Sequence, residues 1–383
     1  MYVTVRDPAA AAQRRAAGRP PLRAVSGTVV LLGLTSLATD LGAEMVVAVL
    51  PIYLTLQLGL GPLAFGVVDG IYQGATALAR LGGGVAADRW RRPKAVAVVG
   101  YALSAVFKLG LLATTSLSLI GTFVAVDRVG KGIRTAPRDA LIAAHSRPDT
   151  LGLSFGVHRA LDTVGAAGGP LLAFALLAAA PRGYDAVFVT SFALAVVGLA
   201  ILVLLVRDQP GHPVPSAPPP DLAALRRLLA DPAYRRVVVV AGLLALTTVS
   251  DGFVYLALLG RNDLAAAAFP LLYVATSAVY LVLAVPLGRL ADRVGRRKVF
   301  LAGHLGLLAA YVVVAGALGG WPAVLAAPAL LGVYYAATDG VLAALAAGIL
   351  PAAVRTTGLA GAQTAASLGR LVAAFGFGLL WVG

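Results

Sequence analysis

The chain has 383 residues, of which 59% are hydrophobic and only 13% are charged, and its formal net charge is +14. Soluble domains carry about 25% charged residues, so this composition argues against a soluble globular domain and favours a protein embedded in a lipid bilayer. The chain contains no cysteine, which excludes disulfide bonds and thiolate metal sites within it.

Eleven segments are long and apolar enough to cross a bilayer, whose hydrocarbon core requires about 20 mostly apolar residues in a helix. In chain order they are residues 26–57, 63–87, 95–116, 118–143, 152–179, 184–206, 237–259, 266–290, 298–318, 322–349 and 357–382. Residues 1–25 precede them and hold five arginines without an apolar core. We therefore expect a basic cytoplasmic tail there and not a cleaved signal peptide.

Positive charge is divided unevenly between the two sets of connections. The tail and alternate loops hold 22 lysines and arginines, whereas the opposite loops hold only Arg182 and Arg261. By the positive-inside rule, this bias places the N-terminus in the cytoplasm of a multi-pass protein, in a bacterial inner or plasma membrane. Membrane orientation and anionic lipid then account for the net charge, and we expect no nucleic-acid partner.

The first span carries Asp40 and Glu44 on one face, one helical turn apart. Two carboxylates at this spacing repel each other when both are ionised. We therefore expect one of the two to take up a proton, which suits a proton-coupling role. In spans 2 and 3, Asp69 and Lys108 are lone charges for which the sequence predicts no role.

Span 4 carries a stripe of charges. Its members Asp127, Lys131, Arg134 and Arg138 follow the i, i+4, i+7, i+11 spacing of a single helix face, and Arg128 lies beside them. A charge at the centre of a bilayer costs about 3 kcal/mol or more, so these groups are expected to face protein or water. Alternatively, Arg134 and Arg138 serve only as a cytoplasmic anchor.

Span 5 carries His158 and Asp162 on one face, with Arg159 a quarter turn away. We expect spans 1, 4 and 5 to bring these groups together near the middle of the membrane. The proton-coupling candidates are Asp40, Glu44, Asp127, His158 and Asp162, and the counter-ion and substrate-binding candidates are Arg128, Lys131, Arg134 and Arg159. His158 has a plainer interpretation as a buried hydrogen-bonding residue, and Asp40, Glu44, His158 and Asp162 have the ligand chemistry of a metal site.

Residues 207–236 form a proline-rich linker followed by a short amphipathic helix, with Leu222, Leu225 and Leu229 on one face. This segment divides a six-helix bundle at 26–206 from a second bundle, spans 7–11, at 237–383. The second bundle is less charged. Its substrate-binding candidates are Asp251, Tyr255, Tyr280, Tyr335, Asp339 and Gln363.

The two bundles contain related sequences, which indicates an internal duplication. "LTSLATDLGAEM" resembles "LALTTVSDGFVY", and this match aligns Asp40 with Asp251. "FGVHRALDTVG" resembles "AGAQTAASLGR", and this match aligns His158 with Gln363. Membrane proteins built from two repeats usually bind their substrate where the repeats meet.

Two loops and one helix carry a family resemblance. "GRLADRVGRRK" and "GVAADRWRRPK" resemble the loop signature of the major facilitator superfamily, and "GAAGGP" in span 5 resembles a motif of its antiporters. The resemblance implies an all-α fold of two pseudo-symmetric bundles, with Asp88, Arg89, Asp292 and Arg293 in gating loops. Members usually have twelve spans, so we expect the twelfth to be absent or truncated. Simple helix packing is the alternative interpretation of "GAAGGP".

These observations predict a secondary transporter that works by alternating access, with proton-coupled export of a small organic compound. The alternatives are proton-coupled uptake of an anionic solute held by Lys131, Arg134 and Arg159, and export of a divalent or transition metal. The sequence holds no HExxH, GxSxG or P-loop motif. We therefore expect no enzymatic activity, no cofactor and no resident metal. The expected partners are the substrate, protons and lipid, and the expected state is a monomer.

Overall fold

The computed structural model describes residues 25–90, 92–147, 150–207, 222–262, 264–317, 319–350 and 355–381. Throughout these residues the regular secondary structure is helical, which confirms the predicted all-α fold. The expected tail at 1–24 and most of the proline-rich linker, 208–221, lie outside the described residues.

Each of the eleven expected segments is helical. The first half comprises α2 (Gly27–Ile52, continued by the π-helical turn Tyr53–Gln57), α3 (Gly61–Trp90), α4 (Pro93–Leu112), α5 (Leu117–Ala144), α6 (Leu151–Ala179) and α7 (Tyr184–Ala200, continued by Ile201–Leu205). The second comprises α8 (Leu222–Ala230), α9 (Pro232–Leu246), α10 (Asp251–Arg261), the 3₁₀ turn Ala266–Ala268, α11 (Phe269–Val294), α12 (Arg296–Val312, continued by Val313–Ala317), α13 (Gly320–Ile349) and α14 (Arg355–Leu380). Among the described residues, eight helical segments are long and apolar enough to cross a membrane.

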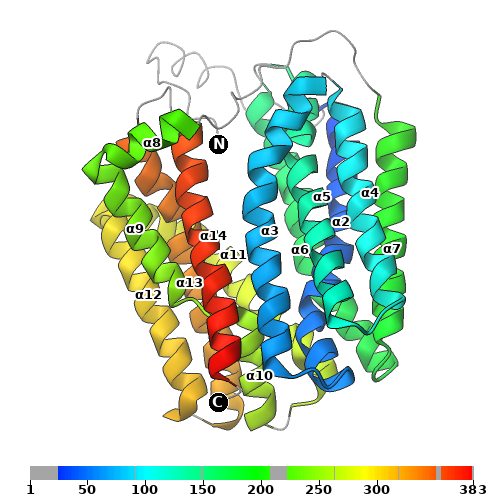
Figure 1. Ribbon diagram of the computed structural model, residues 1–383, viewed down its shortest axis with the longest axis vertical. Coiled ribbons are helices and arrows are strands. Elements are labelled where there is room, and N and C mark those ends of the chain that lie inside the picture. Colours follow the sequence, from blue (N-terminus) through cyan, green and yellow to red (C-terminus); the bar gives the residue numbers. More distant parts are fainter. Residues whose placement is uncertain are drawn as a thin grey trace.

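The long helices form two bundles that stand side by side, α2–α7 and α9–α14 (Figure 1). Across the boundary between them α3 packs against α14, and α6 packs against α11. The short helix α8 lies across one end of the second bundle (Figure 1). Leu228 of α8 is buried against Tyr234, whereas Leu229, which was expected on the apolar face, is exposed.

The seventh expected span differs from its prediction, because α9 and α10 are separate helices with a break at 247–250. The hydroxyls of Thr247 and Thr248 both donate to the carbonyl of Leu244, at 2.8 and 3.1 Å. Side chains that bond local backbone in this way offer the chain an alternative to continuing the helix. A new helix begins after Ser250.

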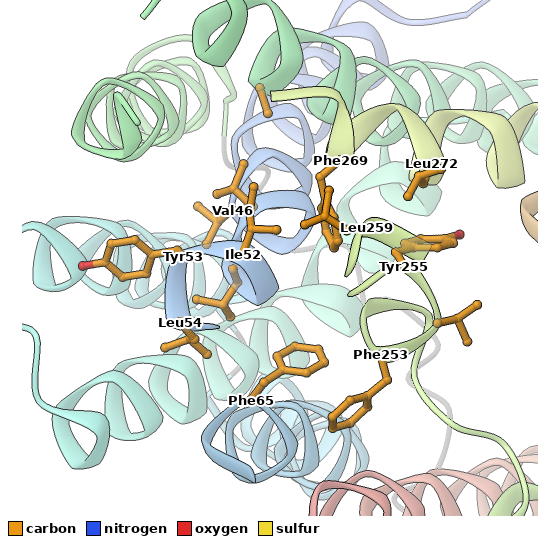
Figure 2. Close-up of a cluster of buried hydrophobic side chains, with 14 of the residues drawn as sticks. Val46, Ile52, Tyr53, Leu54, Phe65, Phe253, Tyr255, Leu259, Phe269 and Leu272 are labelled. Atoms are coloured by element: carbon orange, nitrogen blue, oxygen red, sulfur yellow. The ribbon is translucent and has the colours of Figure 1, made fainter. Parts of the chain in front are cut away.

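An apolar cluster joins the two halves at one end of the molecule (Figure 2). The rings of Phe65 on α3 and Phe253 on α10 meet edge to face, with centroids 4.7 Å apart. Nearby, a Cβ atom placed on Gly66 would lie only 2.6 Å from the carbonyl oxygen of Ala374, so α3 and α14 are in backbone contact. The halves are therefore closed against each other at this end.

Candidate functional site

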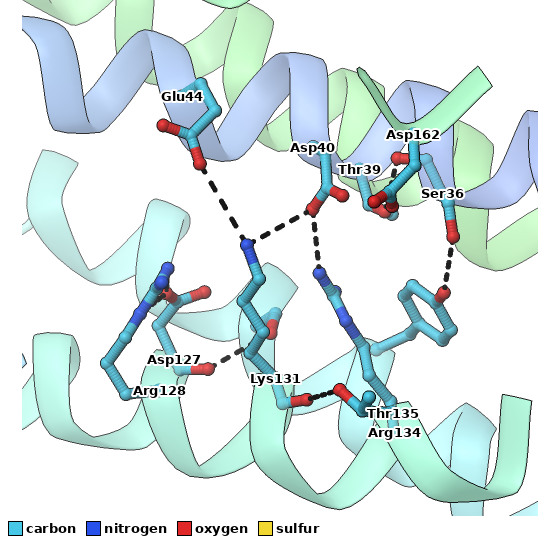
Figure 3. A network of polar contacts seen from close by, with 12 residues as sticks. Ser36, Thr39, Asp40, Glu44, Asp127, Arg128, Lys131, Arg134, Thr135 and Asp162 are labelled. Carbon is cyan, nitrogen blue, oxygen red and sulfur yellow. Dashed lines mark hydrogen bonds and ion pairs between the residues drawn. The ribbon is translucent and has the colours of Figure 1, made fainter. Parts of the chain in front are cut away.

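The predicted charge stripe of α5 faces α2 and forms ion pairs with both of its carboxylates (Figure 3). The Lys131 Nζ atom lies 3.5 Å from Asp40 Oδ1 and 3.9 Å from Glu44 Oε1. Arg134 Nη2 donates to the same Asp40 oxygen at 3.1 Å. One lysine is thus shared between two carboxylates, and one of those carboxylates also binds an arginine.

Farther along α5, Arg138 connects α2 and α6. Its Nη2 donates to Asp139 at 3.0 Å, its Nη1 lies 3.8 Å from Asp162 Oδ1, and it also donates to the hydroxyl of Ser36 at 3.4 Å. His158 is buried, and its Nε2 hydrogen-bonds Ser36 Oγ at 3.0 Å. His158 therefore has the geometry of a satisfied hydrogen-bonding residue next to the charge network.

A second group of charges is buried between α4 and α5. Arg128 donates its Nε to Asp127 Oδ2 at 2.8 Å and makes a further contact to that oxygen through Nη2. The Lys108 Nζ atom lies 3.7 Å from Asp127 Oδ1. All three side chains are at most 4% exposed, so one carboxylate here is shared by two buried cations. The Arg128 guanidinium also stacks on Tyr72, 4.2 Å from the ring centroid.

Glycines bring these helices close enough for their charges to meet. A Cβ atom on Gly165 of α6 would lie 2.5 Å from the carbonyl oxygen of Leu37 on α2, and one on Gly169 would lie 2.7 Å from that of Leu41. Gly100 on α4 and Gly130 on α5 make a similar approach. The "GAAGGP" motif therefore packs α6 against the turns of α2 that carry Asp40 and Glu44.

A cavity of about 240 Å³ lies between the two halves, next to the first charge network. Its polar lining comes from both bundles and includes Glu44, Asp69, Gln73, Asp251, Tyr335 and Arg370. The broken region between α9 and α10 contributes Thr248, Val249 and Ser250 to the wall. Tyr335 donates its hydroxyl hydrogen to Asp251 Oδ1 at 2.7 Å.

Three of the sequence-predicted site residues line this cavity, namely Glu44, Asp251 and Tyr335. Other predicted residues lie outside its described lining: Tyr255 is fully buried against Thr276, Tyr280 is half-buried, and Arg159, Asp339 and Gln363 are exposed. In the predicted gating loops, Asp292 pairs with Arg296 at 2.9 Å and Arg293 is exposed. Asp88 and Arg89 belong to the last turns of α3, and their side chains lie outside the described set.

Seven polar residues of the cavity wall were not among the sequence-predicted site residues: Asp69, Tyr72, Gln73, Thr248, Ser250, Tyr273 and Arg370. A signal was available for two of them, because Asp69 and Gln73 stand one helical turn apart in a span with few polar residues.

Comparison with known proteins identifies relatives along most of the chain. An uncharacterised MFS-type transporter of Methanocaldococcus jannaschii is 31% identical over 294 residues, which cover 74% of this chain and 71% of that protein. An uncharacterised protein of Mycobacterium bovis is 30% identical over 314 residues, which cover 78% of this chain and 73% of that protein.

Solved transporter structures share the fold at low sequence identity. A variant of the nucleoside transporter NupG superposes with a TM-score of 0.77 at 13% identity, covering 92% of this chain and 91% of its own. A peptide transporter, POT, in complex with sulfate has a TM-score of 0.72 at 15% identity, covering 92% of this chain and 93% of its own. The family model described as Major Facilitator Superfamily matches residues 32–264 and 252–382. The chain belongs to the major facilitator superfamily and is a multi-pass membrane protein of the transporter type.

Proposed function

We propose that this protein is a proton-coupled secondary transporter that exports a small organic compound from the cell by alternating access. Its two bundles are closed at one end by the apolar cluster around Phe65 and Phe253, and the cavity lies farther in between the same bundles. A binding site between two repeats that rock against each other is the arrangement that alternating access requires.

The observation that carries the coupling is the sharing of Lys131 between Asp40 and Glu44. Glu44 belongs to the cavity wall, so a ligand or a proton that reaches the cavity acts on this network directly. A proton on Glu44 removes one of the two attractions on Lys131 and leaves the lysine to Asp40. A substrate that neutralises Glu44 has the same effect, so proton and substrate compete for one network. Because only one of the two is bound at a time, the transporter carries the proton and the substrate in opposite directions.

The membrane orientation is part of the proposal. Lysines and arginines concentrate in the tail and in alternate loops, and Arg226 and Arg227 are exposed on α8. We place the N-terminus and α8 in the cytoplasm of a bacterial plasma membrane, where α8 meets anionic lipid. The Phe65–Phe253 cluster then closes the outer end. The protein acts as a monomer, with neither enzymatic activity nor a nucleic-acid partner.

The test is transport by purified protein in lipid vesicles, with a compound selected by a thermal-shift screen of organic cations, zwitterions and anions. An imposed pH gradient accelerates transport by the wild type. The double variant Asp40→Asn with Glu44→Gln loses this acceleration, because neither site then changes its charge. Asp185→Asn is the matched control, since Asp185 is exposed in the first turn of α7. A double variant that keeps the full response to the gradient contradicts the mechanism.

The alternative functions find less support in the geometry. Arg134 is buried, paired with Asp40 and stacked on Tyr101, and the Arg159 side chain is 77% exposed. The described lining of the cavity includes neither of them, nor Lys131, the third residue expected to hold an anion. Within the described residues no group of three His, Cys, Asp or Glu side chains is arranged to hold a metal ion. Export of an organic compound remains the proposal that the cavity supports best.

A further inference from the structure

The charges of the cavity wall do not balance. Glu44 shares Lys131 with Asp40. Arg370 supplies the guanidinium of the wall, and its charge acts on Asp69 and Asp251 as well as on Asp339 and the tyrosines of α13. Asp69 and Asp251 remain, and in the part of the chain that the structure describes, neither forms an ion pair with a lysine or arginine. The wall itself carries three carboxylates, those of Glu44, Asp69 and Asp251, and a single guanidinium, that of Arg370.

These two carboxylates come from opposite halves of the molecule. Asp69 lies on α3 of the first bundle, and Asp251 begins α10 of the second, just after the break in the seventh span. Asp69, Ser250 and Asp251 line the same cavity. Carboxylates at membrane depth are costly and mark ligand or ion pathways.

We propose that Asp69 and Asp251 together bind the charged group of a small organic cation, such as a compact amine. This inference rests on the proposed function and specifies its substrate class. One positive charge placed between the two carboxylates interacts favourably with both. An ammonium group also donates hydrogen bonds, and Tyr335 occupies only Oδ1 of Asp251.

The rest of the wall fits the body of such a ligand. The volume of about 240 Å³ equals roughly eight water molecules at 30 Å³ each, so the ligand is compact. Phe65, Val68 and Val249 supply apolar surface, and Tyr273 supplies an aromatic ring beside the carboxylates. Aromatic rings attract cations through their negatively polarised faces.

This placement also connects binding to movement. Two like charges on opposite halves oppose closure of the cavity, whereas a cation held between them attracts both halves. The cation therefore binds the closed state more tightly than the open state, and its binding shifts the molecule toward the closed state. A neutral or anionic ligand of the same shape lacks this effect, so the pair selects cations by the conformational change as well as by contact.

Three probes that share one skeleton and differ in charge test the inference: benzylamine, benzyl alcohol and benzoate. Binding to the purified full-length chain is measured by calorimetry and by thermal shift. Benzylamine binds at least about tenfold more tightly than benzyl alcohol, as charge-assisted hydrogen bonds exceed neutral ones, and benzoate binds least. Asp69→Asn and Asp251→Asn each weaken benzylamine binding by a similar factor and leave benzyl alcohol unaffected.

Two variants serve as controls. Asp69→Glu keeps the charge and retains most of the benzylamine affinity, and Asp185→Asn, remote from the cavity, binds as the wild type does. The inference is overturned if all three probes bind equally, if benzoate binds more tightly than benzylamine, or if benzylamine does not bind to the folded protein. The proposed function fails independently, when the response to a pH gradient survives in the Asp40→Asn, Glu44→Gln protein. Amine binding does not depend on that result.

Discussion

The buried charged side chains of this protein are stabilised by carboxylates that each pair with two cations. Asp127 pairs with both Arg128 and Lys108, which are 3% and 1% exposed, and Asp40 pairs with both Lys131 and Arg134. A buried charge is tolerated only when a group of opposite charge lies beside it. Removing a shared carboxylate therefore destabilises the fold more than removing one of the cations that share it.

This asymmetry predicts the order of two melting temperatures. Asp127→Asn leaves Arg128 and Lys108 buried without a carboxylate, which costs about 3–5 kcal/mol, because one residue of a buried ion pair has been removed. Lys108→Met keeps the Asp127–Arg128 pair and replaces an ammonium by an apolar group of similar length, at a cost below about 1 kcal/mol. Thermal unfolding in detergent measures both. If Lys108→Met is the less stable variant, the assignment of Asp127 as the shared anion is wrong.

Helix geometry explains which residue contacts were predictable. The i, i+4, i+7 spacing of Asp127, Lys131 and Arg134 places them on one face wherever the helix lies, and the acids of α2 were the available partners. Asp69 and Arg370 depend instead on how two bundles meet, which the periodicity of a single helix does not contain. Their place in the cavity therefore required the structure.

Small residues at the contacts between helices determine how closely the helices pack. Gly165 and Gly169 let α6 approach the backbone of α2, and Gly132 and Ala79 allow a similar contact between α5 and α3. By contrast, Gly156 on α6 has open space around its Cα atom. The same substitution at two positions of one helix therefore has opposite expected effects.

Gly165→Ala lowers stability by about 1–3 kcal/mol, because the added methyl group meets the backbone of Leu37 and forces the helices apart. Gly156→Ala is neutral or stabilises by up to about 1 kcal/mol, since alanine restricts the unfolded chain more than glycine does. The comparison is made by unfolding both variants under identical detergent conditions. Equal stabilities contradict the close contact between α2 and α6.

The break in the seventh span is held by a tyrosine of another helix. The hydroxyl of Tyr311 on α12 accepts from the Val249 N–H at 2.8 Å and donates to the Thr247 carbonyl at 3.1 Å. The uncharged and mostly apolar run of residues 237–249 favoured an unbroken helix, because hydropathy does not register competition by threonine hydroxyls. A tertiary contact of this kind is also invisible in the sequence of the span itself.

Tyr311→Phe leaves both backbone groups without their partner, and we expect amide hydrogen exchange at 247–250 to accelerate by about three- to tenfold, as a typical intramolecular hydrogen bond contributes about 0.5–1.5 kcal/mol. Exchange in the middle of α12 stays unchanged. The measurement is hydrogen exchange read by mass spectrometry. Unchanged protection at the break means that Tyr311 does not stabilise it.

The molecule as a whole consists of two bundles closed at one end and separated by a cavity farther in. The duplication seen in the sequence anticipated this arrangement, and the pair Asp40–Lys131 of α2 and α5 has a counterpart in Asp251–Tyr335 of α10 and α13. The counterpart lacks a cation, and this difference makes the cavity acidic. Alternating access requires the closed end to open.

Because the chain contains no cysteine, a thiol-specific cross-linker reacts only with cysteines that are introduced by mutation. A short bifunctional reagent joining Phe65→Cys to Phe253→Cys fixes the closed end across the two halves, and we expect it to abolish transport. The control pair, Tyr53→Cys with Phe188→Cys, joins rings that are 4.9 Å apart within the first half and leaves transport intact. Full transport after cross-linking the first pair excludes opening at that end.

The most direct test of proton exchange is the pH inside vesicles that start without a pH gradient. When a gradient of a transported compound is imposed, a trapped pH-sensitive dye reports proton movement opposite to the compound in the wild type, and no such movement in the Asp40→Asn, Glu44→Gln variant. Transport of the compound by the wild type without any change of internal pH contradicts the account.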